Sequence, residues 1–442
     1  MKKPEKPISW SSVVLKNPKI VSKALIHGKS PTYKGKYIHW EKTKYLSPPK
    51  GFSRDEWWTA LKIARSGQLR EVPLHDTLKK SFKFSLPDPA LEYLHHIDQG
   101  AGGQIEMLSD GITNPKTRDR YIAHSLIEEA ITSSQLEGAT TTRKAAKEMI
   151  RLKRKPLNRD ERMIFNNYNT MSLIRDRTDS PLTTELILEL HGLLTEGTLD
   201  DTTAVGRFRK QDEDIKVYET ASNEILHSPP PASELNKRVK IMCKFANEEI
   251  PDYFIHPVIR AIILHFWLAY DHPFVDGNGR CARALFYWYM LRKKYWLLEF
   301  ISISQIIKEG PSKYGKAFLY TESDDGDLTY FILYHLKIVT RAIQALHDYI
   351  SWKTKTINHA ETLLQKSSID LNYRQVSLLS HSLRNQDFTY TVKSHKNSNK
   401  IAYETARSDL FDLVEKGLLE KNKKGKTYEF HPIENLSKKI KS

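Results

Sequence analysis

One short segment decides the fold, HPFVDGNGRCAR at residues 272–283. It follows a helical pattern over residues 257–270 and opens a second one over residues 279–293. Gly277 and Gly279 allow the connecting loop to come close to a ligand. The amide groups in the first turn of the second helix then point into the loop and, with the helix dipole, form a site for an anion. The segment therefore predicts two helices joined by a phosphate-binding loop.

The other polar residues of this segment are those of a site for transfer at phosphorus. Arg280 and Arg283 are three residues apart, share one helix face and can bind successive phosphates through their guanidinium groups. Asp276 can offer an oxygen ligand to Mg²⁺, and the Asn278 amide can donate to a phosphate oxygen. His272, whose ordinary pKa is near ~6.5, can remove a proton from an attacking hydroxyl. Each residue type alone is more often structural, so the prediction rests on their joint spacing.

The segment resembles the defining motif of the Fic family, HxFx(D/E)GNGRxxR, without a mismatch. The resemblance continues upstream through IHPVIRAIILHFWLAYDHPF and downstream to DDGDLTYFILYHL. It implies that His272 is the general base, that Asp276 binds Mg²⁺ and that Phe274 is a buried anchor of the loop. It also implies that a nucleotide's phosphates contact Gly277, Asn278, Gly279, Arg280 and Arg283.

The family resemblance also implies an activity. The chain would be a protein adenylyltransferase, which takes ATP as substrate, uses Mg²⁺ and transfers AMP to a Ser, Thr or Tyr hydroxyl of a target protein or of itself. Two alternatives stay open. The same scaffold can move a different nucleotide or a phosphate, because the loop fixes where a diphosphate lies and not which nucleoside it carries. The chain could also be a DNA-binding regulator whose Fic core senses nucleotide, although the intact motif argues against a dead core.

The segment SSQLEG, residues 133–138, resembles the inhibitory motif (S/T)xxxE(G/N) of the family. By this resemblance Glu137 pairs with Arg283 and keeps it away from the γ-phosphate, while Ser133 steadies the end of the helix. One guanidinium group can bind the carboxylate or the phosphate, and a small energy difference then leaves the active state at ~0.1–10 %. The sequence therefore predicts a built-in brake on the activity, although Glu137 could also support the removal of AMP.

Residues 206–231, GRFRKQDEDIKVYETASNEILHSPPP, resemble the flap, a hairpin that lies over the active site in the family. The flap binds the backbone of the target by strand addition. Ile215 and Val217 would hold one face of the target segment. Arg207 and Arg209 could equally be structural ion-pair partners, and without the neighbouring motif the segment would read as a plain surface hairpin.

The C-terminal part has the pattern of a winged helix. A helix (LNYRQVSLLSHSLRN) precedes an extended piece (FTYTV), a polar turn (KSHKNSN), a second helix (YETARSDLFDLVEKGLL) and a basic hairpin (LEKNKKGKTYEF). DNA bases could contact Thr405, Arg407 and Ser408 near the start of the second helix. Phosphates could contact Lys421, Lys423, Lys424 and Lys426 on the hairpin. Dimerisation or target binding through this domain is an equal alternative.

These patterns divide the chain into four parts. Residues 1–104 form a mixed N-terminal extension, residues 105–352 the Fic domain with the inhibitory helix at 120–138, residues 365–432 the winged-helix-like domain, and residues 433–442 a basic tail. The predicted fold is mainly α, with an all-helical Fic core that carries one small β-hairpin, the flap.

The composition of the 442 residues limits which partners, metal sites and locations we expect. Lys and Arg number 69 and Asp and Glu number 53, which gives a formal charge of +16. Because this charge is spread along the chain, a generally basic surface and a nucleic-acid-binding surface are both possible interpretations. Cys243 and Cys281 are too far apart in sequence to suggest a disulfide framework or a zinc site. The N-terminus has no apolar signal segment, and no apolar run is long enough to span a bilayer. We therefore expect a cytoplasmic protein without membrane association.

Overall fold

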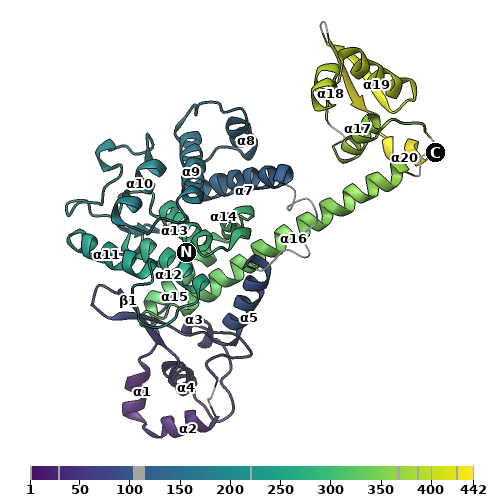
Figure 1. The fold of residues 1–442 in the computed structure, drawn as a ribbon. Coiled ribbons are helices and arrows are strands. Elements are labelled where there is room, and N and C mark those ends of the chain that lie inside the picture. Colours follow the sequence, from purple (N-terminus) through teal and green to yellow (C-terminus); the bar gives the residue numbers. More distant parts are fainter. Residues whose placement is uncertain are drawn as a thin grey trace. The chain divides into compact units, whose positions relative to one another are not determined.

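The computed structural model describes residues 2–27, 30–102, 115–219, 222–365, 369–385, 388–399, 401–424 and 427–441. The chain divides into two units, Met1–Leu346 and His347–Ser442. Both units are mainly helical, which confirms the predicted fold class (Figure 1). The division falls inside one helix, α16 (Thr329–Gln365), so the stretch 353–364 between the two predicted domains is helical. The predicted start of the Fic domain, at residue 105, lies outside the described residues.

The described part of the N-terminal extension consists of short helices and one small hairpin. Its helices are α1 (Trp10–Lys16), α2 (Lys19–His27), α3 (Trp40–Thr43), α4 (Arg54–Ser66) and α5 (Asp88–Ile97), and β1 (Arg70–His75) pairs antiparallel with β2 (Ser81–Phe84). Ser53 and Glu56 start α4 with a capping box. Lys83 of β2 exchanges backbone bonds with Gly326 and Leu328. This pairing joins the extension to the loop before α16, within the first unit.

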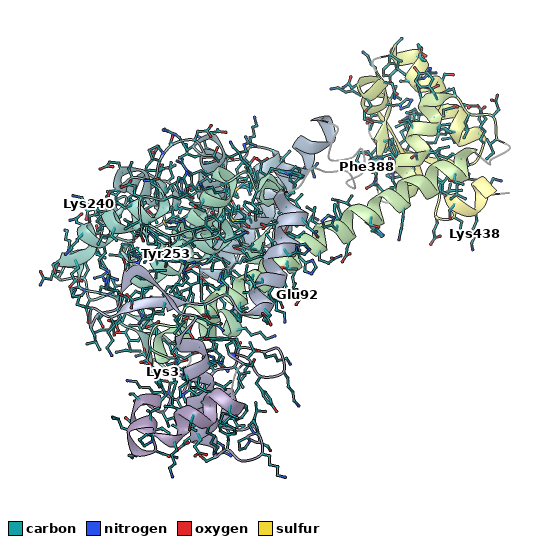
Figure 2. The ribbon with its side chains drawn as sticks, turned by 60° about the horizontal axis from the view of Figure 1, so that its bottom comes forward. Lys3, Glu92, Lys240, Tyr253, Phe388 and Lys438 are labelled. Atoms are coloured by element: carbon teal, nitrogen blue, oxygen red, sulfur yellow. The ribbon has the colours of Figure 1, made fainter. Side chains whose placement is uncertain are left out.

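The rest of the first unit is a bundle built around two buried helices, α12 (Pro257–Asp271) and α13 (Asn278–Arg292) (Figure 1). Almost every side chain of both helices is buried, as expected for helices that are covered on all sides. The helices around them are α7 (Pro115–Leu136), α8 (Arg143–Arg151), α9 (Arg159–Asp176), α10 (Thr184–Thr195), α11 (Leu235–Ala246), α14 (Ile303–Lys308), α15 (Pro311–Ser323) and the first part of α16. The loop between α11 and α12 carries Tyr253, labelled in Figure 2, whose ring stacks on Arg70 of β1.

Buried polar contacts fix α7 against this bundle. The Glu129 carboxylate, 2 % exposed, accepts hydrogen bonds from the hydroxyls of Tyr287, Ser302 and Ser304 at 2.9, 2.7 and 2.5 Å. A buried carboxylate is stable only when it is well hydrogen-bonded, so these contacts define the register of α7. They thereby place the C-terminal end of α7 next to α13.

The second unit, beyond the end of α16, holds α17 (Tyr373–Arg384), α18 (Val392–Asn399), α19 (Tyr403–Glu415) and α20 (Leu436–Lys441). Its sheet is antiparallel in the order β5 (Tyr390–Thr391), β7 (Thr427–Pro432), β6 (Leu419–Lys424). Apolar side chains, among them Leu410, Leu413 and Phe430, form its core. The segment 433–442, predicted as a basic tail, contains α20, whose Leu436 and Ile440 are buried in that core.

The prediction of a polar turn at KSHKNSN, residues 393–399, is wrong, because these residues belong to α18. Thr391 and Ser394 exchange hydrogen bonds between side chain and backbone at 2.9 and 3.1 Å, which starts the helix. Val392 and His395 are buried on its inner face. Capping and burial of one face therefore override the weak helix propensity of Ser and Asn.

Within the described ranges, no helix combines the length and the hydropathy that a bilayer crossing requires.

Candidate active site

His272 ends α12 in a left-handed conformation, with φ 45° and ψ 56°. Its ring atom Nδ1 lies 3.2 Å from the carbonyl oxygen of Ala269. A carbonyl only accepts hydrogen bonds, so Nδ1 carries the proton and Nε2 presents a lone pair. Burial lowers the pKa of His272 to about 4. At neutral pH the side chain is therefore an uncharged imidazole that can accept a proton at Nε2.

The loop after His272 is held in shape by its own side chains. Asn278 lies at the start of α13 and is buried; its Oδ1 accepts from the Phe274 amide at 3.0 Å and its Nδ2 donates to the Phe274 carbonyl at 2.8 Å. Gly277, the preceding residue, has φ 83°, a conformation that favours glycine. The first amides of α13 have no acceptor within the helix, as at any helix N-terminus. The sequence predicted an Asn278 contact to phosphate; the structure places its amide against Phe274.

His191 of α10 supports the loop from the other side, which the sequence did not indicate. Its Nδ1 accepts from the Gly206 amide at 3.1 Å, so Nε2 carries the proton and donates to the Asp276 carbonyl at 3.0 Å. The ring stacks on Phe274 with a centroid distance of 3.8 Å. Burial lowers the pKa of His191 to about 4, so the ring is neutral and keeps this tautomer. Phe274 is fully buried, as the resemblance implied for an anchor.

The two arginines of the motif have different surroundings, and both are buried. Arg280 donates through Nη1 to the Leu194 carbonyl at 2.9 Å, and its Nη2 lies 3.5 Å from Asp276 Oδ2. Arg283 donates through Nε to Ser133 Oγ at 2.8 Å and through Nη2 to the Ser133 carbonyl at 3.0 Å. Its Nη2 also donates to Glu137 Oε1 at 2.7 Å. The end of α7 therefore binds Arg283 on two edges.

Glu137 follows α7 directly, and its carboxylate reaches the first turn of α13. A Cβ atom added to Gly279 would lie only 2.2 Å from Glu137 Oε1. The carboxylate thus lies against the helix N-terminus, where a negative charge is favoured, as well as against Arg283. A phosphate bound to the same turn would compete with it for both contacts.

A cavity of about 240 Å³ opens beside these groups. His272, Glu137 and Gly279 line it, so the structure brings together the predicted base, the predicted inhibitor and one residue of the predicted phosphate loop. Apolar side chains make up much of the remaining wall, namely Val217, Leu226, Ala269, Phe318 and Leu319. Between α10 and α11, β3 (Val217–Tyr218) pairs antiparallel with β4 (Ile225–His227). Ile215 precedes β3, is half-buried and is not among the described lining residues.

Arg207 and Arg209, which the sequence left open, both have structural partners. Arg207 pairs with Glu213 at 2.7 Å. Arg209 donates through Nε to the His272 carbonyl at 2.9 Å and through Nη2 to the Pro230 carbonyl, and its amide donates to the Pro273 carbonyl at 2.8 Å. Arg209 therefore holds the turn that carries His272, although nothing in the residue spacing predicted this contact.

Asp276 fits a magnesium ion that is bound mainly by phosphates and water. Its Oδ1 accepts from the Gly277 amide, and its side chain is 45 % exposed beside the first turn of α13. Mg²⁺ often uses only one or two carboxylates when a substrate's phosphates complete its shell. The described residues contain no cluster of three or more His, Cys, Asp or Glu side chains that could hold a metal by itself.

Comparison with known proteins gives a family match within the first unit. Residues 181–290 match the Fic/DOC family, a range that includes the hairpin and the loop 272–283 but not Glu137. A protein of Nematostella vectensis called protein adenylyltransferase Fic is 27 % identical over 119 residues, 27 % of this chain and 26 % of the relative. A protein of the same name from Drosophila ananassae is 28 % identical over 186 residues, 42 % of this chain and 33 % of the relative. The chain thus spans a third or less of the length of these curated relatives.

One solved structure shows that the fold is shared over most of the chain. The crystal structure of a Fic family protein from Desulfovibrio desulfuricans superposes with a TM-score of 0.52 at 18 % sequence identity. The match covers 79 % of this chain and 98 % of the other.

Proposed function

We propose that this chain, through its Fic/DOC-family domain at residues 181–290, transfers AMP from ATP to a hydroxyl group of a protein. One observation carries the proposal: His272, whose Nδ1 is bound to the Ala269 carbonyl so that Nε2 is unprotonated, lines the same cavity as Gly279 in the first turn of α13. A base beside a helix N-terminus is the arrangement that transfer from a polyphosphate requires. The name of the curated relatives supports AMP as the transferred group and protein as the acceptor.

The residues of the site would act in one step. The acceptor hydroxyl gives its proton to His272 Nε2 while its oxygen attacks the α-phosphorus of ATP; the bond from that phosphorus to the bridging oxygen breaks, and pyrophosphate leaves. The first amides of α13 and the guanidinium groups of Arg280 and Arg283 offset the negative charge. Asp276 would hold the magnesium ion, which when bound neutralises part of the polyphosphate charge.

The hairpin β3–β4 would present the target to this site. Its partner strand β4 leaves the other edge of β3 available for strand addition, and backbone bonds there demand little of the target's sequence. Val217 supports this role because it lies both in β3 and in the cavity wall. Ile215, just before β3, would contact the same target segment.

The contacts of Glu137 support a brake on this activity. Its carboxylate occupies Arg283 and the first turn of α13, both of which a nucleotide's phosphates would need. The inhibited and active states would then differ by which anion Arg283 binds. Ser133 would stabilise the inhibited state through its bond to Arg283 Nε.

The choice of nucleotide is tested by intact-protein mass spectrometry. The Glu137→Gly protein is incubated with Mg²⁺ and ATP, GTP, CTP or UTP in separate reactions, together with a cell extract as a source of targets. We expect protein adducts with the mass of AMP, and at least tenfold fewer adducts from the other three. Preferred transfer of another nucleoside monophosphate, or of a bare phosphate, would replace AMP in the proposal while keeping the site.

The C-terminal unit supports a second role, in DNA binding. Its order of helix, strand, two helices and hairpin supports a winged helix, in which α19 would be the recognition helix. Arg407 and Ser408 are exposed and Thr405 is half-buried on that helix. Arg407 lies 3.6 Å from Glu404, an exposed pair that a phosphate could replace. Lys426 lies outside the described residues, and Lys424 is described by its backbone alone.

If this unit binds duplex DNA, affinity should fall steeply with salt. Arg407→Ala combined with Lys421→Ala and Lys423→Ala should lower affinity and reduce the salt slope by about one for each lost phosphate contact. Lys438→Ala, on α20, is the control for loss of charge alone. Fluorescence anisotropy across a salt series measures both quantities. Equal loss in the control, or no binding by the unchanged protein, would leave a homodimer contact or target binding as its role.

We also propose a cytoplasmic location. Cys243 and Cys281 are both free and buried, and burial raises the pKa of each thiol to about 12. Thiols that are unpaired and kept protonated fit a reducing compartment.

A further inference from the structure

His227, the last residue of β4, lies between two hydrogen-bond acceptors. Its Nε2 is 2.7 Å from the Tyr270 carbonyl oxygen, and its Nδ1 is 2.8 Å from Glu322 Oε2. A carbonyl and a carboxylate can only accept, so both ring nitrogens must carry protons for both bonds to form. The side chain of His227 is 8 % exposed and that of Glu322 is 26 % exposed. The geometry therefore requires an imidazolium at this position, paired with the Glu322 carboxylate of α15.

The other charged groups near His227 leave this pair intact. Asp271 of α12 is the second carboxylate close by, but Arg238 of α11 binds it at 2.8 and 2.6 Å, and Trp267 donates to it at 3.0 Å. Arg209, on the first arm of the hairpin, donates to backbone carbonyls and has no carboxylate at bonding distance among the described residues. Glu322 is therefore the counterion of His227.

The acceptor on the other side of His227 belongs to the turn that carries the proposed base. In this turn the Tyr270 carbonyl is bound by His227, and the carbonyls of His272 and Pro273 are bound by Arg209. Arg209 lies before β3, and His227 lies at the end of β4. His272 itself has a positive φ of 45°, which is unfavourable for a non-glycine residue unless its surroundings hold it. The hydrogen bonds of His227 and Arg209 thus join the hairpin to the turn that carries His272.

We propose that His227 is a positioning residue: as an imidazolium bound to Glu322, it locks the second strand of the target-docking hairpin to the turn that carries His272. This lock keeps the edge of β3 that would bind the target at a fixed distance from His272. This inference rests on the proposed transfer function for its purpose, but its structural part can be measured without activity.

The lock has a definite pH dependence. Glu322 and the Tyr270 carbonyl raise the pKa of His227 above its ordinary value near 6.5, although burial opposes the shift. The charged form and its stabilising bonds are therefore fully present below that ordinary value. They are lost as the pH rises through the raised pKa, because a neutral ring has one N–H and can serve only one acceptor. Transfer activity should then show an alkaline limb that belongs to His227 and not to His272, whose pKa is lowered.

Two conservative variants and one control test this assignment. Glu322→Gln removes the counterion and keeps the size of the side chain, and His227→Gln keeps a donor for Tyr270 without a charge. Glu309→Gln is the control, since Glu309 forms an exposed pair with Arg341 at 2.6 Å outside the site. The protonation state of His227 is read by NMR of protein labelled with ¹⁵N in its histidine rings, with His227→Gln as the assignment. The mobility of β4 is read by hydrogen exchange of peptides from residues 222–231, corrected for the intrinsic effect of pH.

We expect the His227 ring to be doubly protonated at pH 7 in the unchanged protein and in Glu309→Gln. In Glu322→Gln its titration should shift down by at least one pH unit. In the unchanged protein β4 should exchange about tenfold faster above the pH at which His227 loses its proton than below it, the effect of one lost hydrogen bond. The alkaline limb of activity should disappear in His227→Gln. A singly protonated ring at pH 7, or an exchange rate of β4 that stays constant across the His227 titration in the unchanged protein, would overturn the lock. Normal exchange results without any nucleotide transfer would instead refute the proposed function and leave the lock standing.

Discussion

Replacing Glu137 by glycine is expected to raise the rate of AMP transfer roughly 10- to 1000-fold, the range for release of a state that is ~0.1–10 % populated. The carboxylate accepts from Arg283 Nη2 at 2.7 Å and lies against Gly279, so its removal frees the N–H of Arg283 that it binds and a helix N-terminus at once. Both then bind phosphate in place of carboxylate. The rate is measured as AMP incorporated from labelled ATP into protein at saturating Mg²⁺.

Gln135→Gly is the matched control for this experiment. It puts the same residue into the same helix end, but Gln135 contacts Thr141 and Lys308 and not Arg283. Its rate should stay within about twofold of the unchanged protein. Equal activation in both variants would mean that a loosened α7, and not a freed Arg283, causes the effect. No activation in a folded Glu137→Gly protein would remove the brake from the proposal.

Replacing His272 by alanine, in the Glu137→Gly background, is expected to lower transfer by about 10²- to 10⁴-fold, the usual contribution of a general base. In the unchanged protein burial lowers the pKa of His272 to about 4, and Glu137, which raises this pKa, is absent from the parent, so Nε2 stays free down to at least that pH. The rate should therefore fall on the acid side near pH 4 and not near the ordinary value of ~6.5. Initial rates from pH 4 to 9 measure both effects.

His96→Ala makes the same chemical change at an exposed position in α5 and should leave the rate unchanged. Calorimetric titration with a non-hydrolysable ATP analogue shows whether the phosphate site survives in His272→Ala. We expect that it does, because the hydrogen bonds by which Asn278 and His191 hold the loop do not involve the His272 ring. Full activity of a folded His272→Ala protein would mean that another group takes the proton.

Local sequence signals predicted the two helices on either side of the motif well. Helices α12 and α13 lie where the helical patterns around residues 272–283 placed them. The failure at α18 has a physical cause. Its Ser- and Asn-rich sequence reads as a turn, and the burial of Val392 and His395 that stabilises it depends on the rest of the C-terminal unit.

The candidate site shows the same difference between local sequence signals and contacts made by distant residues. Its motif residues are neighbours in the chain, so one segment was enough to predict a base, an anion cradle and two arginines. The supports of these residues come from elsewhere: His191 is 85 positions before Asp276, and Glu322 is 95 positions after His227. No periodicity or spacing connects such pairs, because only folding brings them together.

The sequence by itself determined the mainly helical fold and the two helices joined by a glycine-containing loop at residues 272–278, since both depend on residues within a few turns of one another. Only the tertiary structure decided which nitrogen of His272 is free, that Asn278 holds Phe274, and that the Glu137 carboxylate lies on the first turn of α13. These features arise from contacts between distant segments. Their geometry and their desolvation exist only once the helices have packed.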